Sequence, residues 1–113
     1  MKRGEIYLAE LSPRSGSEQT GKRPVIIVSN DGFNTSTSWR SIIVIPISTT
    51  RARKGETIVN IAKGIAGLSD DSVALCHQIT TIDRSKLINY LGQLPEALMA
   101  DLEVAIKAAL DMD

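Results

Sequence analysis

The alternation of apolar and polar segments predicts a series of short strands followed by one helix. Apolar, often β-branched runs are separated by segments rich in Gly, Pro, Asn, Asp and Ser. These runs predict six strands, at residues 4–11, 25–28, 42–47, 56–61, 72–80 and 87–91. After Pro95, apolar residues recur at helical spacing over 96–111, which predicts an amphipathic helix. The predicted fold class is therefore mostly β with α: a small, strongly bent antiparallel barrel with a C-terminal amphipathic helix packed on it.

A polar loop leads directly into the second predicted strand. Residues 18–24 carry Lys22 and Arg23, and Pro24 separates them from the apolar run 25–28. Because a proline disfavours helical geometry in the residue before it, we expect Arg23 to be extended and to project from a fixed backbone at the start of the strand. A planar guanidinium suits phosphate or carboxylate recognition. A solvated basic pair beside a strand is the competing interpretation.

Hydroxyl groups follow the third predicted strand, which is apolar on both faces. Residues 42–47 end in Ser48, Thr49 and Thr50, and a basic loop at 51–55 comes next. If strands 25–28 and 42–47 are antiparallel neighbours, Arg23 lies near these hydroxyls and the group can grip a phosphodiester. In RNA the 2′-hydroxyl is an internal nucleophile, so orientation and charge stabilisation can suffice without a metal. Taken alone, the basic loop is equally well a solvated turn.

Two single residues allow more than one interpretation. His77 shares one face of the predicted strand 72–80 with Val73, Leu75 and Ile79. We therefore expect a packed or hydrogen-bonded histidine rather than a catalytic one. Trp39 interrupts a polar stretch, where packing on the barrel is favoured over an exposed base-stacking surface.

Composition excludes several classes of protein. The length of 113 residues predicts a single domain over 1–113, and the apolar runs are too short to span a membrane, so we expect a cytoplasmic protein. Cys76, the only cysteine, lies in an apolar run and is expected to be a buried, inert thiol. With one cysteine and one histidine, the usual structural zinc site is not available, and no nucleophile elbow or phosphate-binding loop occurs.

The formal charge of zero conceals two unequal halves. Residues 1–63 contain ten Lys or Arg and five Asp or Glu, whereas residues 64–113 contain three and eight. This asymmetry permits a local anion-binding face without general affinity for nucleic acid, which requires many phosphate contacts.

Several short motifs occur in order along the whole chain. They are residues 3–9 (RGEIYLA), 16–19 (GSEQ) with 23–25 (RPV), 45–47 (IPI), and 78–79 (QI) with 81–83 (TID). Together they resemble the MazF/PemK family of toxin endoribonucleases. The resemblance implies an SH3-like barrel, a homodimer, and metal-independent, cofactor-free cleavage of single-stranded RNA at specific sequences, leaving a cyclic phosphate and a 5′-hydroxyl. It also implies a cognate MazE-like antitoxin whose extended acidic tail occupies the RNA groove.

The resemblance assigns catalysis to Arg23 and to Ser48, which stands where the family has threonine; Thr49 could substitute for Ser48 in part. Because arginine is a poor base, we expect Arg23 chiefly to stabilise charge. The expected RNA-binding residues are Glu18, Gln19, Lys22, Asn30, Arg51, Arg53 and Gln78. His77 and Thr80 depart from the glutamate and arginine of many relatives.

Two other classes of function compete with the ribonuclease. One is a toxin of the CcdB type, which has a similar barrel but binds a protein such as DNA gyrase and cleaves nothing. The other is a peptide-binding SH3-like adaptor, which needs an aromatic-lined groove. The four aromatic residues, Tyr7, Phe33, Trp39 and Tyr90, are scattered along the chain, which disfavours the adaptor and also disfavours RNA capture by stacking.

Overall fold

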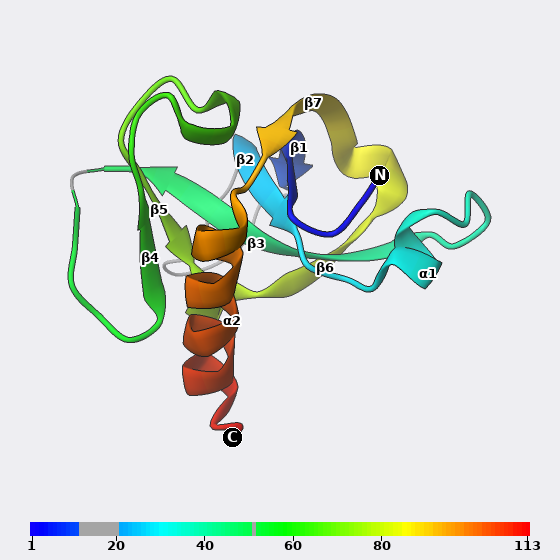
Figure 1. Ribbon diagram of the computed structural model, residues 1–113. Coiled ribbons are helices and arrows are strands. Elements are labelled where there is room, and N and C mark those ends of the chain that lie inside the picture. Colours follow the sequence, from blue (N-terminus) through cyan, green and yellow to red (C-terminus); the bar gives the residue numbers. More distant parts are fainter. Residues whose placement is uncertain (12–20, 51) are drawn as a thin grey trace.

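A seven-stranded antiparallel sheet and a C-terminal helix make up the structure (Figure 1). The computed structural model describes residues 1–11, 21–50 and 52–113. The strands are β1 (Glu5–Leu11), β2 (Gly21–Ile27), β3 (Ser41–Thr49), β4 (Ile58–Ile61), β5 (Ser72–Leu75), β6 (Thr80–Asp83) and β7 (Leu87–Gln93). They follow the order β4-β5-β3-β2-β1-β7, and β6 pairs with β3. The helices are α1 (Asp31–Asn34) and α2 (Glu96–Leu110), with short 3-10 helices η1 (Ile65–Gly67), η2 (Cys76–Gln78) and η3 (Arg84–Lys86).

Strand β3 is the centre of the sheet because it pairs along both edges. One edge pairs with β2, and the other pairs first with β6 and then with β5. Along this second edge Ile47 pairs with Ala74, whereas Val44, three residues earlier, pairs with Thr80, six residues later. The ladder therefore accommodates three extra residues, and these are η2.

The prediction of one strand over 72–80 is thus wrong. Apolar residues continue through the segment, but β5 and β6 are separate strands on either side of η2. Pro46 lies in the part of β3 that pairs with neither of them. A proline lacks the N–H that a ladder requires, so it fits at such an interruption, as the sequence suggested.

Several predicted boundaries shift. β2 begins at Gly21, four residues before the apolar run, so Arg23 lies within a strand and pairs with Ala9 of β1. β3 extends to Thr49, and β4 begins at Ile58 instead of residue 56. Main-chain pairing with a neighbouring strand determines where each strand begins and ends, so these boundaries differ from the ends of the apolar runs. Between β2 and β3 lies the short helix α1, where the Asn30 side chain accepts from the Phe33 N–H.

Apolar side chains cover both faces of the central strands. In β2, Ile26 packs into one cluster while Val25 and Ile27 pack into another, as alternation requires. The larger cluster includes Ile6, Ile26, Ile45, Ile47, Val59, Ile61, Leu68, Ala74, Cys76, Leu94, Leu102 and Ala105. The smaller includes Ala9, Leu11, Val25, Ile27, Ile42, Val44 and Ile82. This explains why residues 42–47 are apolar on both faces.

Helix α2 closes the larger cluster. It begins after Pro95 and ends at Asp111, whose φ of 55° leaves the helical region, so the predicted helix is confirmed within one residue at its end. Leu102 and Ala105 are buried in this cluster, and full burial of a leucine contributes about 1.5–3 kcal/mol. In the part of the chain that the structure describes, no helix has the length and apolar character needed to cross a membrane.

Candidate active site

Arg23 and Ser48 lie on the paired strands β2 and β3. The pairing sets Ile26 opposite Ile45 and Val25 opposite Pro46, where this ladder ends. Arg23 comes two residues before Val25 on β2, and Ser48 comes two residues after Pro46 on β3. Both residues are half-buried. The antiparallel pairing that the sequence analysis expected is therefore confirmed, while the proximity of the cation to the hydroxyl stays a prediction.

A polar pocket opens beside Ser48. It has a volume of about 470 Å³. Its lining residues come from the end of β3, the loop before β4, and η2: Ser48, Thr50, Arg53, Lys54, Gly55, Thr57, Ile58, Leu75, His77 and Gln78. Hydroxyl, amide, imidazole and cationic groups thus face one cavity, a set of donors that suits an anionic, hydrogen-bonding ligand.

Two hydroxyls at the end of β3 reach this pocket, but Thr49 is not one of them. Ser48 and Thr50 line the pocket, whereas Thr49 is exposed and pairs with Ser72 of β5. Alternation along the strand explains the difference, because successive side chains point to opposite faces. A catalytic role for Thr49 stays a prediction, and the second hydroxyl beside Ser48 is that of Thr50.

The three residues of η2 present His77 and Gln78 to the pocket. His77 is exposed, and its Nδ1 lies 3.2 Å from the Thr57 hydroxyl oxygen. The expectation that His77 packs among Val73, Leu75 and Ile79 is wrong, because the chain leaves the ladder at Cys76 and the strand alternation stops there. The expected hydrogen bond is present. Strand interruptions of this kind often re-aim side chains beside active sites.

Cys76 is the buried member of η2. Its thiol lies in the larger apolar cluster, and desolvation raises its pKa to about 11. The thiolate is the reactive form of cysteine, so this thiol is inert near neutral pH, in agreement with the sequence.

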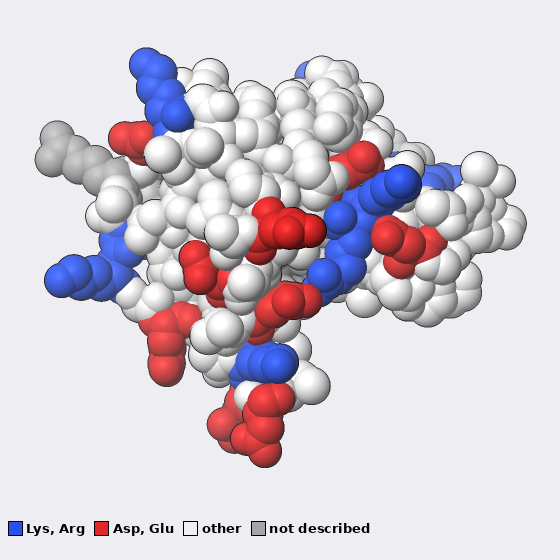
Figure 2. Space-filling model, in the orientation of Figure 1, with Lys and Arg blue, Asp and Glu red and all other residues white. Residues whose placement is uncertain are grey.

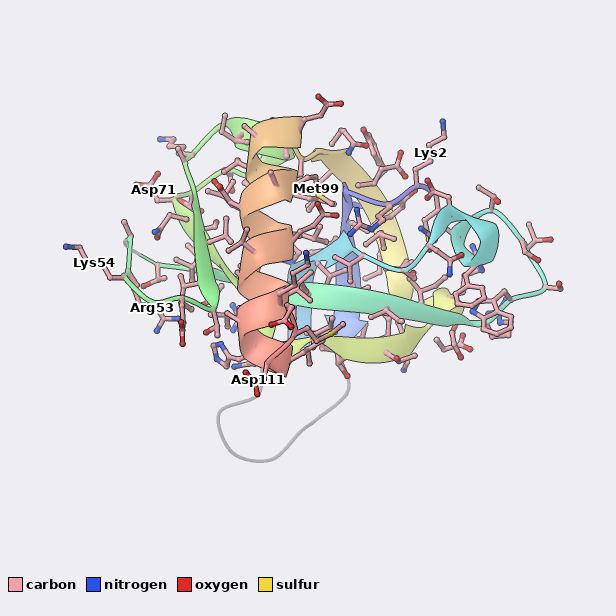
Figure 3. The ribbon with its side chains drawn as sticks, turned by 60° about the horizontal axis from the view of Figure 1, so that its bottom comes forward. Lys2, Arg53, Lys54, Asp71, Met99 and Asp111 are labelled. Carbon is pink, nitrogen blue, oxygen red and sulfur yellow. The ribbon has the colours of Figure 1, made fainter. Side chains whose placement is uncertain are left out.

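The basic loop after β3 is fixed by a side chain of β4. The Asn60 amide accepts from the backbone N–H of Arg53 at 2.9 Å and donates to the Arg53 carbonyl at 2.8 Å. Figure 3 shows Arg53 and Lys54 on this loop, with Lys54 extending away from the body of the protein. Two backbone bonds hold the loop, so Arg53 starts from a defined position at the pocket.

The charges on this view of the surface are unevenly distributed. Figure 2 shows acidic side chains gathered over α2, with basic side chains both at the edge formed by the loop after β3 and on the other side of the helix, toward α1. The acidic residues at or after the start of α2 are Glu96, Asp101, Glu103, Asp111 and Asp113. The basic groups of the loop after β3 favour an anion at the side of the pocket.

The remaining predicted RNA-binding residues fall in different places. Lys22 is exposed on β2, opposite Glu10 of β1. Asn30 caps α1 by accepting from the Phe33 N–H at 3.0 Å, on the opposite side of the molecule from the loop after β3 (Figure 1). Its RNA-binding role stays a prediction. Glu18, Gln19 and Arg51 lie outside the described residues.

Arg84 organises a second loop, a role that sequence reasoning missed. Asp83 caps η3 by accepting from the Ser85 N–H at 2.8 Å. The half-buried Arg84 guanidinium donates to four backbone carbonyls, two at the end of α1 and two in the segment between α1 and β3. They are those of Phe33 at 2.9 Å, Asn34 at 3.1 Å, Ser36 at 2.8 Å and Trp39 at 2.9 Å.

Trp39 packs within this loop. Its ring stacks on Phe33 with centroids 4.2 Å apart and planes at 8°, and its Nε1 donates to the Ser41 carbonyl at 2.7 Å. The prediction that Trp39 packs on the barrel is wrong: its ring packs on Phe33 of α1 and remains 42% exposed.

Comparisons with known proteins show that this chain is similar to toxins. A family model described as PemK-like, MazF-like toxin of type II toxin-antitoxin system matches residues 2–110. A protein of Staphylococcus saprophyticus named endoribonuclease MazF is 39% identical, over 99% of this chain and 92% of the relative.

Solved structures agree with the fold. The Mycobacterium tuberculosis toxin MazF-mt6 superposes with a TM-score of 0.80 at 28% identity, covering 96% of this chain and 98% of the toxin. A mycobacterial endoribonuclease in complex with its cognate antitoxin gives a TM-score of 0.80 at 26% identity, covering 100% and 97%. The predicted barrel-like, mostly β fold with a C-terminal helix is confirmed.

Proposed function

Because the chain belongs to the family of PemK-like, MazF-like toxins of type II toxin-antitoxin systems, we propose that it cleaves single-stranded RNA at specific sequences without a metal ion or cofactor. Membership confirms the predicted family. The observation that carries the proposal is the pocket lined by Ser48 and by other polar and basic groups, at the end of the strand that pairs with the strand carrying Arg23.

The proposed reaction uses the substrate's own nucleophile. The 2′-oxygen attacks the adjacent phosphorus, the bond from phosphorus to the 5′-oxygen breaks, and the 5′-oxygen takes up a proton. The products are a 2′,3′-cyclic phosphate and a 5′-hydroxyl. Negative charge grows on the phosphate oxygens in the transition state, and a guanidinium held on a strand stabilises it without reorganising. This is the role of Arg23.

Ser48 contributes a hydroxyl to the same phosphate. A serine retains the hydrogen-bond donor of the threonine common in the family, so the substitution preserves the chemistry. Thr50 supplies the second hydroxyl in the pocket, the part that the sequence analysis gave to Thr49. Together they orient the phosphodiester for attack, and positioning of this kind accounts for much of the rate in a reaction with an internal nucleophile.

RNA binding is assigned to groups around the pocket. Lys22 and Arg53 contact phosphates, and Gln78 reads a base edge, because amides can pair with bases on both their donor and acceptor sides. We further propose that the protein is a homodimer in the cytoplasm and binds an antitoxin with an extended acidic segment. The mycobacterial relative solved with its antitoxin supports such a partner, and so do the basic groups at the pocket.

The test is cleavage of a long single-stranded RNA by purified protein with EDTA present, followed by mapping of the ends. We expect discrete sites with 5′-hydroxyl ends. Arg23→Ala should lose at least about a hundredfold in rate, since one preorganised charge-stabilising donor is worth about 3–4 kcal/mol.

Arg40→Ala is the matched control, because Arg40 forms an exposed ion pair with Asp83 outside the pocket, and it should cleave at nearly the wild-type rate. Equal cleavage by Arg23→Ala would refute the role of Arg23. Intact RNA with the wild-type protein would refute the ribonuclease and favour a toxin that acts on a protein.

A further inference from the structure

The proposed ribonuclease requires a proton acceptor, and the residues assigned so far do not provide one. The 2′-hydroxyl must lose its proton as its oxygen attacks phosphorus. An arginine stays protonated in proteins, and a serine or threonine hydroxyl is a very weak base at neutral pH. The question is which other group at the pocket can accept the proton.

His77 is the group at the pocket with the required chemistry. Among the described residues that line it, none is an aspartate or glutamate, and Arg53 and Lys54 are cations. Imidazole is the side chain that ordinarily changes charge between pH 5 and 8, so its neutral form can accept a proton at physiological pH. His77 is also exposed, which allows it to exchange protons with solvent.

The imidazole ring is held in place by the loop across the pocket. Nδ1 lies 3.2 Å from the Thr57 hydroxyl oxygen. When Nδ1 carries the ring hydrogen and donates it to Thr57, the lone pair is on Nε2. A partner on one ring nitrogen commonly fixes the tautomer and the reactivity of the other.

We infer that His77, placed at the pocket by the three-residue excursion of η2 and oriented by Thr57, is the general base of the cleavage reaction. Nε2 takes the 2′-proton while the 2′-oxygen bonds to phosphorus. The 5′-oxygen leaves with the electron pair of the broken bond and takes a proton from water. The imidazolium then returns its proton to solvent. This inference rests on the proposed ribonuclease activity.

Several charged residues lie on the elements next to His77. The loop before β4 carries Arg53, Lys54 and Glu56, and Cys76 precedes the histidine. Helix α2, which packs against η2, carries Glu96, Asp101, Glu103 and Lys107. The described parts of β3 and β4 have no titratable side chain. Glu56 directly precedes Thr57, which contacts the His77 ring. A variant without this carboxylate therefore tests whether Glu56, rather than His77, causes a pH effect.

The experiment measures kcat and KM from pH 5 to 9 on an RNA oligonucleotide that carries a mapped cleavage site. For the wild type, kcat should fall toward low pH as the imidazole gains a proton. His77→Gln should lower kcat at pH 7.5 by at least about a hundredfold, because general base catalysis contributes about 10²–10⁴. Its KM should stay within about threefold, and its acidic limb should be absent. In Glu56→Gln the limb should remain.

Chemical rescue provides the second readout. Added imidazole should restore part of the activity of His77→Ala and none of that of Arg23→Ala, and Thr57→Val should lower kcat while keeping the acidic limb. A His77→Gln enzyme that changes KM alone, or that keeps the wild-type rate and profile, would overturn the inference while leaving the ribonuclease intact. A wild-type protein that cleaves no RNA would overturn both.

Discussion

Replacing Arg84 with alanine tests the claim that one side chain fixes the loop between α1 and β3. The guanidinium makes four hydrogen bonds of 2.8–3.1 Å to backbone carbonyls, two at the end of α1 and two in this loop. Each such bond contributes about 0.5–1.5 kcal/mol net. The hydrogen bond to the Trp39 carbonyl is exposed, so water can replace it in the variant. We therefore expect Arg84→Ala to lower the free energy of unfolding by about 2–4 kcal/mol.

Thermal unfolding followed by circular dichroism measures this loss. In a domain of this size, about 1 kcal/mol corresponds to roughly 4 °C in Tm, so the variant should melt about 8–16 °C below the wild type. Arg40→Ala is the matched control, because its ion pair with Asp83 is exposed at both partners and such pairs contribute about 0–1 kcal/mol.

The loop itself carries a local reporter. Trp39 is the only tryptophan of the chain, and it stacks on Phe33 within the segment that Arg84 holds. Native Arg84→Ala protein should therefore show altered tryptophan emission, while Arg40→Ala should not. If the two variants unfold within about 1 kcal/mol of each other and emit alike, the four hydrogen bonds do not stabilise the loop and the reasoning is refuted.

Two further predictions concern close packing and thiol reactivity. Gly67→Ala should destabilise by more than about 2 kcal/mol in a urea titration, because Gly67 has a φ of 77° and an added Cβ would collide with a carbonyl of β7. Gly64→Ala is its control, because Gly64 has a φ of 90° and no atom lies within 4 Å of an added Cβ. This variant should lose only about 1 kcal/mol of stability through backbone strain. Equal losses of stability in the two variants would contradict the packing argument. Cys76, whose burial raises its pKa to about 11, should resist a thiol reagent at pH 8 in the native protein and react at once in guanidinium chloride; rapid reaction in the native state would show that the thiol is accessible.

The sequence was most informative where one local pattern determined the structure. Apolar runs located the strands, and helical spacing located α2. The antiparallel pairing of the strands that carry Arg23 and Ser48 was also expected from the sequence, because neighbouring strands of an antiparallel sheet bring the start of one to the end of the other.

Features that depend on distant partners were not predictable in this way. Nothing between Ser72 and Thr80 signals an interruption, because η2 exists only through the separate pairing of β5 and β6 with β3. The predicted environment of His77 was wrong for that reason. The role of Arg84 was missed because its carbonyl partners lie much earlier in the chain, and main-chain carbonyls leave no mark on a residue pattern.

The separate pairing of β5 and β6 has a consequence for how such a protein can diversify. Each strand is anchored to β3 by its own ladder, so the length and composition of the segment between them can change without shifting either register. Substitutions there alter what the pocket presents while the sheet is conserved. Under the proposed function, changes in η2 are therefore a route to a different target sequence that leaves the sheet intact.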